Sequence, residues 1–122
     1  MALIVGYSIR QLEFGETIPD QDKSVLLRAA RVDLTTPIKG EDLPKGTRLL
    51  KAYATSPAGA KRIVFMLVVE EGDLFLLFYR NKNDPVGENI TIKNKAFKTQ
   101  LSKHLDVLLT DIENGRFETL EI

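Results

Sequence analysis

The fold is decided by the stretch Arg62–Arg80, which reads RIVFMLVVEEGDLFLLFYR. Two apolar runs, Arg62–Val69 and Leu74–Arg80, flank the acidic turn Glu70–Asp73. Each run has apolar residues on both faces of an extended chain, which is typical of central strands that are covered on both sides. Gly72 supplies the positive φ that a tight hairpin turn needs. The stretch therefore predicts an antiparallel hairpin at the centre of a sheet.

Strands are also expected on either side of this hairpin. Thr47–Thr55 has an apolar face formed by its even residues, whereas the opposite face is mixed and carries Lys51 and Tyr53. The first nine residues suit a strand, and the alternating segment Phe117–Ile122 suits a short one. We therefore expect the α+β class, with an antiparallel sheet of three to five strands, the core hairpin 62–80 and helices packed against the sheet.

Helices are expected in two places. Asp20 or Asp22 caps a helix that runs to about Asp33. Asn94 caps a second helix, Lys95–Asn114, whose apolar stripe predicts that it packs on the sheet; the stripe comprises Phe97, Leu101, Leu105, Leu108 and Ile112. His104 borders this stripe, where we expect a partly exposed residue. The Pro- and Gly-containing segments 36–46 and 81–93 are expected to be loops.

The composition excludes several classes of protein. The chain has 122 residues, so we expect one domain spanning 1–122. It has no cysteine and one histidine, which excludes disulfide scaffolds, thiol nucleophiles and His-rich metal sites, and we expect no cofactor. Acidic residues interrupt the longest apolar stretch and no basic leader begins the chain, so we expect a cytoplasmic protein without membrane contact.

Charge is balanced overall but uneven along the chain. The formal net charge is zero, with 17 basic and 17 acidic residues. Residues 39–103 hold twelve Lys or Arg against seven Asp or Glu, whereas residues 104–122 hold one against five. This pattern indicates either solvated faces or an anion-binding surface in the middle of the chain.

Cations and a phenol gather at the expected strand ends. Arg62 opens one strand of the hairpin, and Tyr79, Arg80 and Lys82 end the other, so pairing should bring these residues together. A cluster of Arg, Lys and Tyr suits phosphate, and fixed cations can stabilise the charge that builds up when a ribose 2′-OH attacks phosphorus. The alternative is that strand-end cations keep the sheet soluble and protect its edges.

The run Lys61–Val69, the acidic turn and the run Leu74–Lys82 together resemble the last two sheet strands of the RelE/ParE-like toxins of bacterial toxin–antitoxin systems. In that family an Arg opens the penultimate strand, and an aromatic residue followed by Lys or Arg ends the next one. The preceding strand carries further basic residues, as Arg48 and Lys51 do here. The resemblance covers about Thr47–Lys82 and, in general outline, the helical N-terminal half.

The resemblance implies an α+β fold, ribosome-dependent mRNA cleavage or gyrase inhibition, and neutralisation by a cognate antitoxin. Its implied catalytic residues are Arg62, which stabilises phosphate charge, Lys82, which binds phosphate, and Tyr79, which stacks on a base or assists proton transfer. Its implied RNA-binding residues are Arg80, Lys51, Lys61 and Arg48, and no metal is implied. We expect Arg62 and Lys82 to meet at one mouth.

Three functions remain open from the sequence. The first, which we favour, is a RelE-like toxin that cleaves ribosome-bound mRNA and so inhibits translation. The second is a non-enzymatic binding protein of the same fold, either a ParE-like gyrase inhibitor or an inactive member. The third is a small oligomeric structural domain without an active site, and a homodimer is open in each case.

Overall fold

The computed structural model describes residues 2–122, apart from the side chain of Val32, so Met1, the first residue of the expected N-terminal strand, lies outside the described part. Described helices are α1 (Tyr7–Phe14), α2 (Asp20–Ala29), the 3-10 turn η1 (Val32–Leu34) and α3 (Lys95–Glu113). Described strands are β1 (Ala2–Gly6), β2 (Thr36–Ile38), β3 (Thr47–Ser56), β4 (Gly59–Val68), β5 (Leu74–Asn81) and β6 (Phe117–Glu121).

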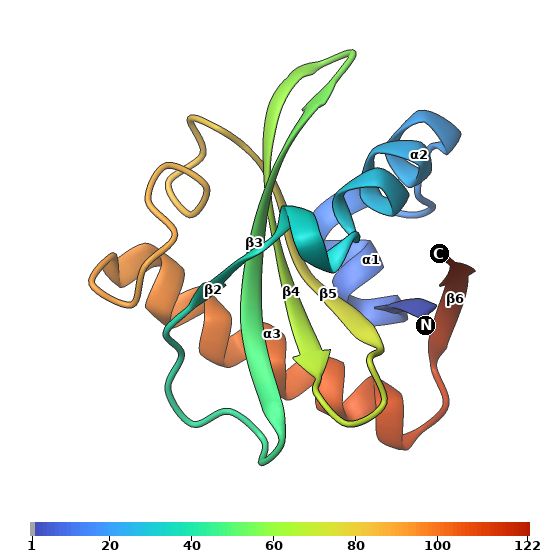
Figure 1. The fold of residues 1–122 in the computed structure, drawn as a ribbon, viewed down its shortest axis with the longest axis vertical. Coiled ribbons are helices and arrows are strands. Elements are labelled where there is room, and N and C mark those ends of the chain that lie inside the picture. The colour runs from blue at the N-terminus through green and yellow to red at the C-terminus, as the bar shows by residue number, and fades with distance from the viewer. Residues whose placement is uncertain (1) are drawn as a thin grey trace.

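The six strands form one mixed sheet in the order β2-β3-β4-β5-β1-β6. Neighbouring strands are antiparallel, except that β1 runs parallel to β5. The β1–β5 pairing is short and joins Leu3 to Leu74 and Ile4 to Phe75. The second half of β5 therefore has no strand on that side, and α1 lies there instead (Figure 1).

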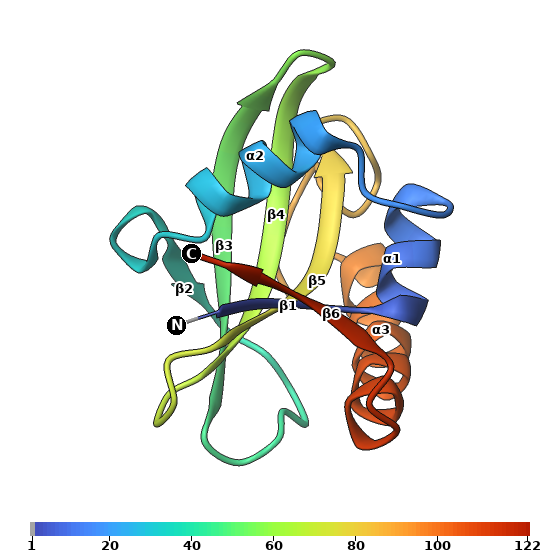
Figure 2. The ribbon, with the colours of Figure 1, turned by 90° about the vertical axis from the view of Figure 1, so that its right-hand side faces the viewer.

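Helices cover the sheet on both faces. In Figure 2, α2 crosses in front of β3 and β4, while α3 lies to the right of β5. The buried residues Val25, Leu26 and Ala29 hold α2 to the first face. Phe97 of α3 lies 5.5 Å from the ring of Phe78 on the other face. We call these the α2 face and the α3 face.

The expected core hairpin is confirmed. Strands β4 and β5 pair antiparallel from Lys61↔Asn81 to Leu67↔Leu74, with one irregularity between Val64 and Phe65. Gly72 has φ of 77° in the connecting turn. Every residue of β5 from Leu74 to Tyr79 is buried, because helices cover both faces of this strand.

The fold class is α+β as expected, but the expectation of an antiparallel sheet with three to five strands is wrong in two respects. Strand β1 lies parallel to β5. The alternation of apolar and polar residues along a strand does not reveal whether the strand pairs in a parallel or an antiparallel direction. The sixth strand, β2, lies in the expected loop 36–46 and pairs with Leu49–Lys51. It has three residues and includes Pro37, which is tolerated because β2 is an edge strand.

The N-terminal region also differs from expectation. The chain leaves β1 at Gly6, and Tyr7 and Ile9, expected in the strand, begin α1. The apolar run at the N-terminus thus serves a short strand and one buried helix face, which periodicity alone does not separate. Helix α2 ends at Ala29, four residues earlier than expected, and η1 follows.

Helix α3 agrees closely with the sequence. The Asn94 side chain caps it by accepting a hydrogen bond from the Ala96 N–H at 3.1 Å. The stripe residues Phe97, Leu101, Leu105 and Leu108 are buried, and so is His104, which was expected to be partly exposed. Within residues 2–122, no helix is long and apolar enough to cross a membrane.

Helix α3 also caps α1. The residue that immediately precedes α1 is Gly6. It has no side chain that could accept hydrogen bonds from the free N–H groups of the first turn. Asp111 of α3 takes this role, because its Oδ2 accepts a hydrogen bond from the Ser8 N–H at 2.6 Å. A Cβ at position 6 would lie 3.2 Å from that same oxygen, so glycine leaves room for the cap.

We therefore expect Asp111→Ala to lower the free energy of unfolding by about 1 kcal/mol, the usual cost of losing a helix cap. Urea denaturation followed by circular dichroism measures the change. Asp106→Ala is the matched control, because Asp106 is exposed on the same helix. Equal effects of the two substitutions would contradict the capping role.

Candidate functional site

The alternation of side chains along β4 and β5 divides the expected site between the two faces of the sheet. Arg62 pairs with Arg80, and Ile63 pairs with Tyr79. Residues paired across an antiparallel ladder lie on the same face, and successive residues lie on opposite faces. Arg62 and Arg80 therefore lie on the α3 face, whereas Lys61 and Tyr79 lie on the α2 face.

On the α3 face, β3 and β4 carry a group that we call the cationic platform, formed by Lys51, Tyr53 and Arg62. Tyr53 pairs directly with Arg62 across the two strands. The Arg62 guanidinium carbon lies 4.2 Å from the centre of the Tyr53 ring, and Lys51 Nζ lies 5.4 Å from it. Tyr53 is 61% exposed, so much of the ring remains open to solvent.

The cations of the platform are not neutralised. Among the described residues, neither Lys51 nor Arg62 has a carboxylate within ion-pair distance. Arg62 makes one long hydrogen bond, from Nη1 to the carbonyl oxygen of Lys61 at 3.5 Å. Its guanidinium face packs on Tyr53, which leaves most of the N–H edge free for an anion.

The backbone of Lys82 lies close to that of Arg62. Its backbone N–H donates to the carbonyl of Ala60 at 3.1 Å, which extends the β4–β5 ladder by one bond beyond Lys61↔Asn81. In this register Lys82 lies diagonally across from Arg62, a placement in which Cα atoms are about 7–8 Å apart. Lys82 is exposed and has no ion pair with a described residue. The backbones of the two residues are thus close, and neither residue has an ion pair with a described residue.

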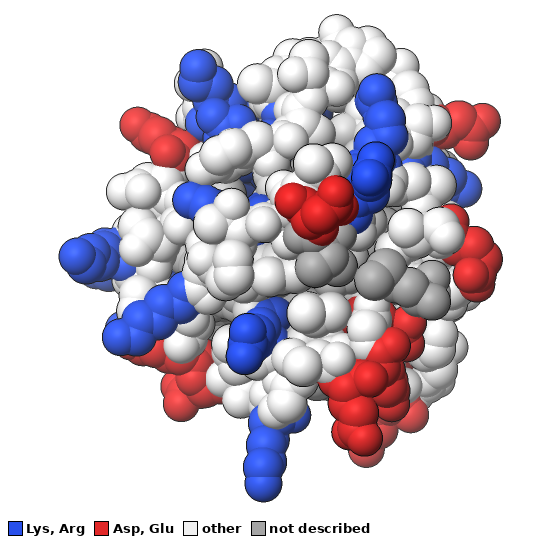
Figure 3. Space-filling view, viewed as in Figure 1, with Lys and Arg blue, Asp and Glu red and all other residues white. Residues whose placement is uncertain are grey.

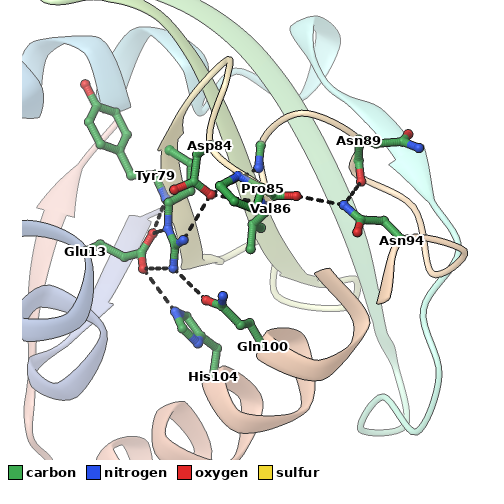
Figure 4. A network of polar contacts seen from close by, with 11 residues as sticks. Glu13, Tyr79, Asp84, Pro85, Val86, Asn89, Asn94, Gln100 and His104 are labelled. Atoms are coloured by element: carbon green, nitrogen blue, oxygen red, sulfur yellow. Dashed lines mark hydrogen bonds and ion pairs between the residues drawn. The ribbon is translucent and has the colours of Figure 1, made fainter. Parts of the chain in front are cut away.

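Arg80 shares this face but is already engaged by a buried carboxylate. Glu13, at the end of α1, has a fully buried carboxylate that accepts from Arg80 Nε at 2.7 Å and from Arg80 Nη2 at 2.9 Å (Figure 4). Asp84 and Gln100 accept further bonds from Arg80 at 3.2 and 2.9 Å. Arg80 therefore fixes the end of β5 to α1 and α3, and its charge is compensated internally.

Glu13 binds two further groups. Its Oε1 accepts a hydrogen bond from the Tyr79 N–H at 2.7 Å, on the side of β5 that β1 leaves uncovered. Its Oε2 lies 3.0 Å from His104 Nε2. Burial alone would raise the pKa of Glu13, but the hydrogen bonds from His104, Arg80 and Tyr79 outweigh it, so the pKa lies below its ordinary value of 4.5. The His104 ring stacks on Phe78 at 4.4 Å, which explains its burial.

Tyr79 lies apart from Arg62 and Lys82. Its ring points away from the Glu13 carboxylate in Figure 4, and its hydroxyl donates to Asp22 of α2 at 2.7 Å. Burial and the bond to Asp22 raise the pKa of Tyr79 well above its ordinary value of 10.0. This placement does not suit the expected stacking on a base beside Arg62, nor a proton transfer there.

Lys61 accompanies Tyr79 on the α2 face. Its Nζ donates to Asn81 Oδ1 at 2.6 Å and lies 5.1 Å from the centre of the Tyr79 ring. These residues line a pocket of about 500 Å³ at the end of the hairpin, together with Asp22 and Asp84. The acidic residues in its wall make this pocket a poorer place for phosphate than the cationic platform.

Arg48 is also separate from the platform. It pairs with Leu67 near the start of β3, whereas Tyr53 pairs with Arg62 near the other end. As an even residue of β3 it shares its face with Ala52, on the α2 side. Two of the expected RNA-binding residues, Arg48 and Lys61, therefore lie outside the group on the α3 face.

No single basic patch dominates the face seen in Figure 3. Lys and Arg side chains are spread over it, and a group of Asp and Glu gathers at the lower right. That region corresponds to the β4–β5 turn in Figure 1, which carries Glu70, Glu71 and Asp73. The basic balance of residues 39–103 thus does not appear as one continuous surface on this side.

Three residues of this region were not selected as site residues from the sequence. Tyr53 lay on the mixed face of its strand with Lys51, but its pairing with Arg62 depends on a register that the sequence does not give. Glu13 and His104 are 91 positions apart in the sequence, so no local pattern indicates that they are in contact.

Within residues 2–122, no group of three or more His, Cys, Asp or Glu side chains could hold a metal ion.

Comparison of the chain with models of known protein families, with curated proteins and with solved structures finds no match. The functional interpretation therefore depends on the geometry described above.

The Glu13 network generates a pH prediction. Because the folded-state pKa of Glu13 lies below its ordinary value, its contribution to stability is complete above about pH 4.5 and is lost as the pH falls through the folded-state pKa. We expect Glu13→Gln to lower the free energy of unfolding by about 3 kcal/mol at pH 7, because Arg80 loses its buried partner. The difference from wild type should shrink toward pH 3.

Urea denaturation between pH 3 and pH 7 measures this difference. Glu16→Gln, which changes an exposed carboxylate three residues away, is the matched control and should leave stability within about 0.5 kcal/mol of wild type. A Glu13→Gln deficit that stays constant or grows on acidification would show that the carboxylate is not held in its charged form.

Proposed function

We propose that the chain is a RelE-like toxin that inhibits translation by cleaving mRNA on the ribosome, and that a cognate antitoxin neutralises it in the cytoplasm. The observation that supports this is the cationic platform: two unpaired cations and an exposed tyrosine on one sheet face, with Lys82 diagonal to Arg62. An anion with an aromatic base satisfies both parts of this surface. A strand of RNA offers both in every nucleotide.

The proposed chemistry is the attack of a ribose 2′-OH on the adjacent phosphorus. The attack forms a new P–O bond to the 2′ oxygen and breaks the bond to the 5′ oxygen. The proton of the 2′ hydroxyl passes to water, and the departing 5′ oxygen takes a proton from water, so the products are a 2′,3′-cyclic phosphate and a 5′ hydroxyl. Negative charge increases on the nonbridging oxygens in the transition state, so fixed cations stabilise that state more than the ground state. Arg62 supplies planar donors for these oxygens, and Lys82 and Lys51 supply point charges.

A non-enzymatic binding protein of the same fold, such as a gyrase inhibitor, is the second candidate. This candidate is favoured because two residues that the resemblance assigns to RNA cleavage or RNA binding already bind other side chains of the protein. Tyr79 is bound to Asp22 on the other face, and Arg80 is bound to Glu13. A binding surface needs only the platform and Lys82, whereas catalysis also needs water to accept the proton.

The toxin proposal predicts that induction of the wild-type chain in bacteria arrests growth and that Arg62→Ala relieves the arrest. We expect mRNA cleavage on programmed ribosomes to fall by a hundredfold or more, the usual loss when one donor to a developing oxyanion is removed. Primer extension on the message measures cleavage. The fold should be retained, because Arg62 makes no ion pair with a described residue.

Lys45→Ala is the matched control, since it removes an exposed lysine from the loop before β3, and growth arrest should persist. Arrest with intact transcripts and blocked DNA supercoiling would favour the gyrase inhibitor. A wild-type chain that is harmless on its own would exclude both toxin functions and favour a structural domain.

A further inference from the structure

Tyr53 is the most exposed large apolar or aromatic side chain among the described residues, at 61%. It lies on a strand whose neighbouring residue Ala52 is buried, so the strand itself is firmly packed. An exposed tyrosine is common and needs no explanation by itself. Its two cationic neighbours, however, distinguish it from the other tyrosines of the chain.

The environments of the three tyrosines differ. Tyr7 has one cation at its ring, Arg10, which also forms an ion pair with Glu118 at 3.7 Å. Tyr79 is buried, and its hydroxyl is bound to Asp22. Tyr53 combines an open ring with two cations, one along its own strand and one across the ladder, and no described carboxylate pairs with either cation.

We propose that the Tyr53 ring is a stacking subsite for an unpaired base of single-stranded RNA, with Lys51 and Arg62 binding the phosphates on either side of that nucleotide. This inference rests on the proposed function, which it deepens by naming the residue that receives the base. A guanidinium packed on one part of the ring keeps its N–H edge for phosphate, while the exposed part of the ring accepts a base. Rigid strands hold all three groups, so little ordering accompanies binding.

The proposal is tested with the isolated full-length protein and a fluorescently labelled 12-nucleotide single-stranded RNA, with binding followed by anisotropy. We expect Tyr53→Leu to weaken binding roughly tenfold to a hundredfold, the usual contribution of one stacked base, while Tyr53→Phe binds as wild type because it keeps the ring. Lys45→Ala is again the matched control. An oligomer of the same length with abasic sites should bind wild type and Tyr53→Leu equally.

Salt dependence provides a second measurement. Removing Lys51 or Arg62 should lower the slope of log K against log salt by about 0.7 each, one phosphate contact on a single strand, whereas Tyr53→Leu should leave the slope unchanged. Absence of RNA binding by wild type, or equal affinity of wild type and Tyr53→Leu, would overturn the stacking subsite.

Failure of the stacking subsite and failure of the toxin proposal give different experimental results. If ribosomes programmed with message are cut equally by wild type and by Tyr53→Leu, the toxin proposal stands and the stacking subsite fails. If message stays intact while Tyr53→Leu loses affinity for RNA, the subsite stands and the nuclease proposal fails.

Discussion

The buried carboxylate of Glu13 makes polar contacts to two elements that pack against α1, namely β5 and α3. Strand β1 pairs with only the start of β5, so the N–H groups farther along that edge have no strand to bind. Glu13 accepts one of these from Tyr79 and also binds Arg80 and His104, which connects α1, β5 and α3. A charge buried in this way is tolerable only when its hydrogen bonds are satisfied, and here they are. The position of β5, and with it the end of the hairpin, depends on this contact.

The same contact limits which cations are available for a ligand. Arg80 shares a face with Arg62, but its donors are directed to Glu13, Asp84 and Gln100. Lys51, Arg62 and Lys82 have no such partners among the described residues. The chain thus has one cation that is held by buried and polar side chains and others that have no carboxylate partner among the described residues. Counting basic residues does not separate paired from unpaired cations. The formal net charge of the chain, which is zero, does not separate them either.

The sequence predicted the central hairpin, the cap and stripe of α3 and the terminal strand, because these depend on local periodicity and on residues such as Asn94 and Gly72. It missed α1, since Tyr7 and Ile9 continue an apolar run that suits a strand equally well. The sequence alone could have placed Arg62 and Tyr79 on opposite faces of the predicted hairpin. Side chains alternate between the two faces along each strand, and Arg62 is expected to pair with Arg80, the neighbour of Tyr79. The partner of Arg80 and the pairing of Tyr53 with Arg62 depend on long-range contacts that local patterns do not encode.

The pairing of β1 with β6 has a consequence for how the protein is made. Ala2 lies opposite Glu121, so β1 acquires this neighbour only after residues 117–121 have been translated. Ladders between such distant segments form late and slowly, because a long loop must close before any contact compensates for it. The sheet therefore cannot be completed before residues 117–121 have been synthesised. A polypeptide released prematurely, without residues 117–121, exposes the backbone of β1 and invites pairing with other chains.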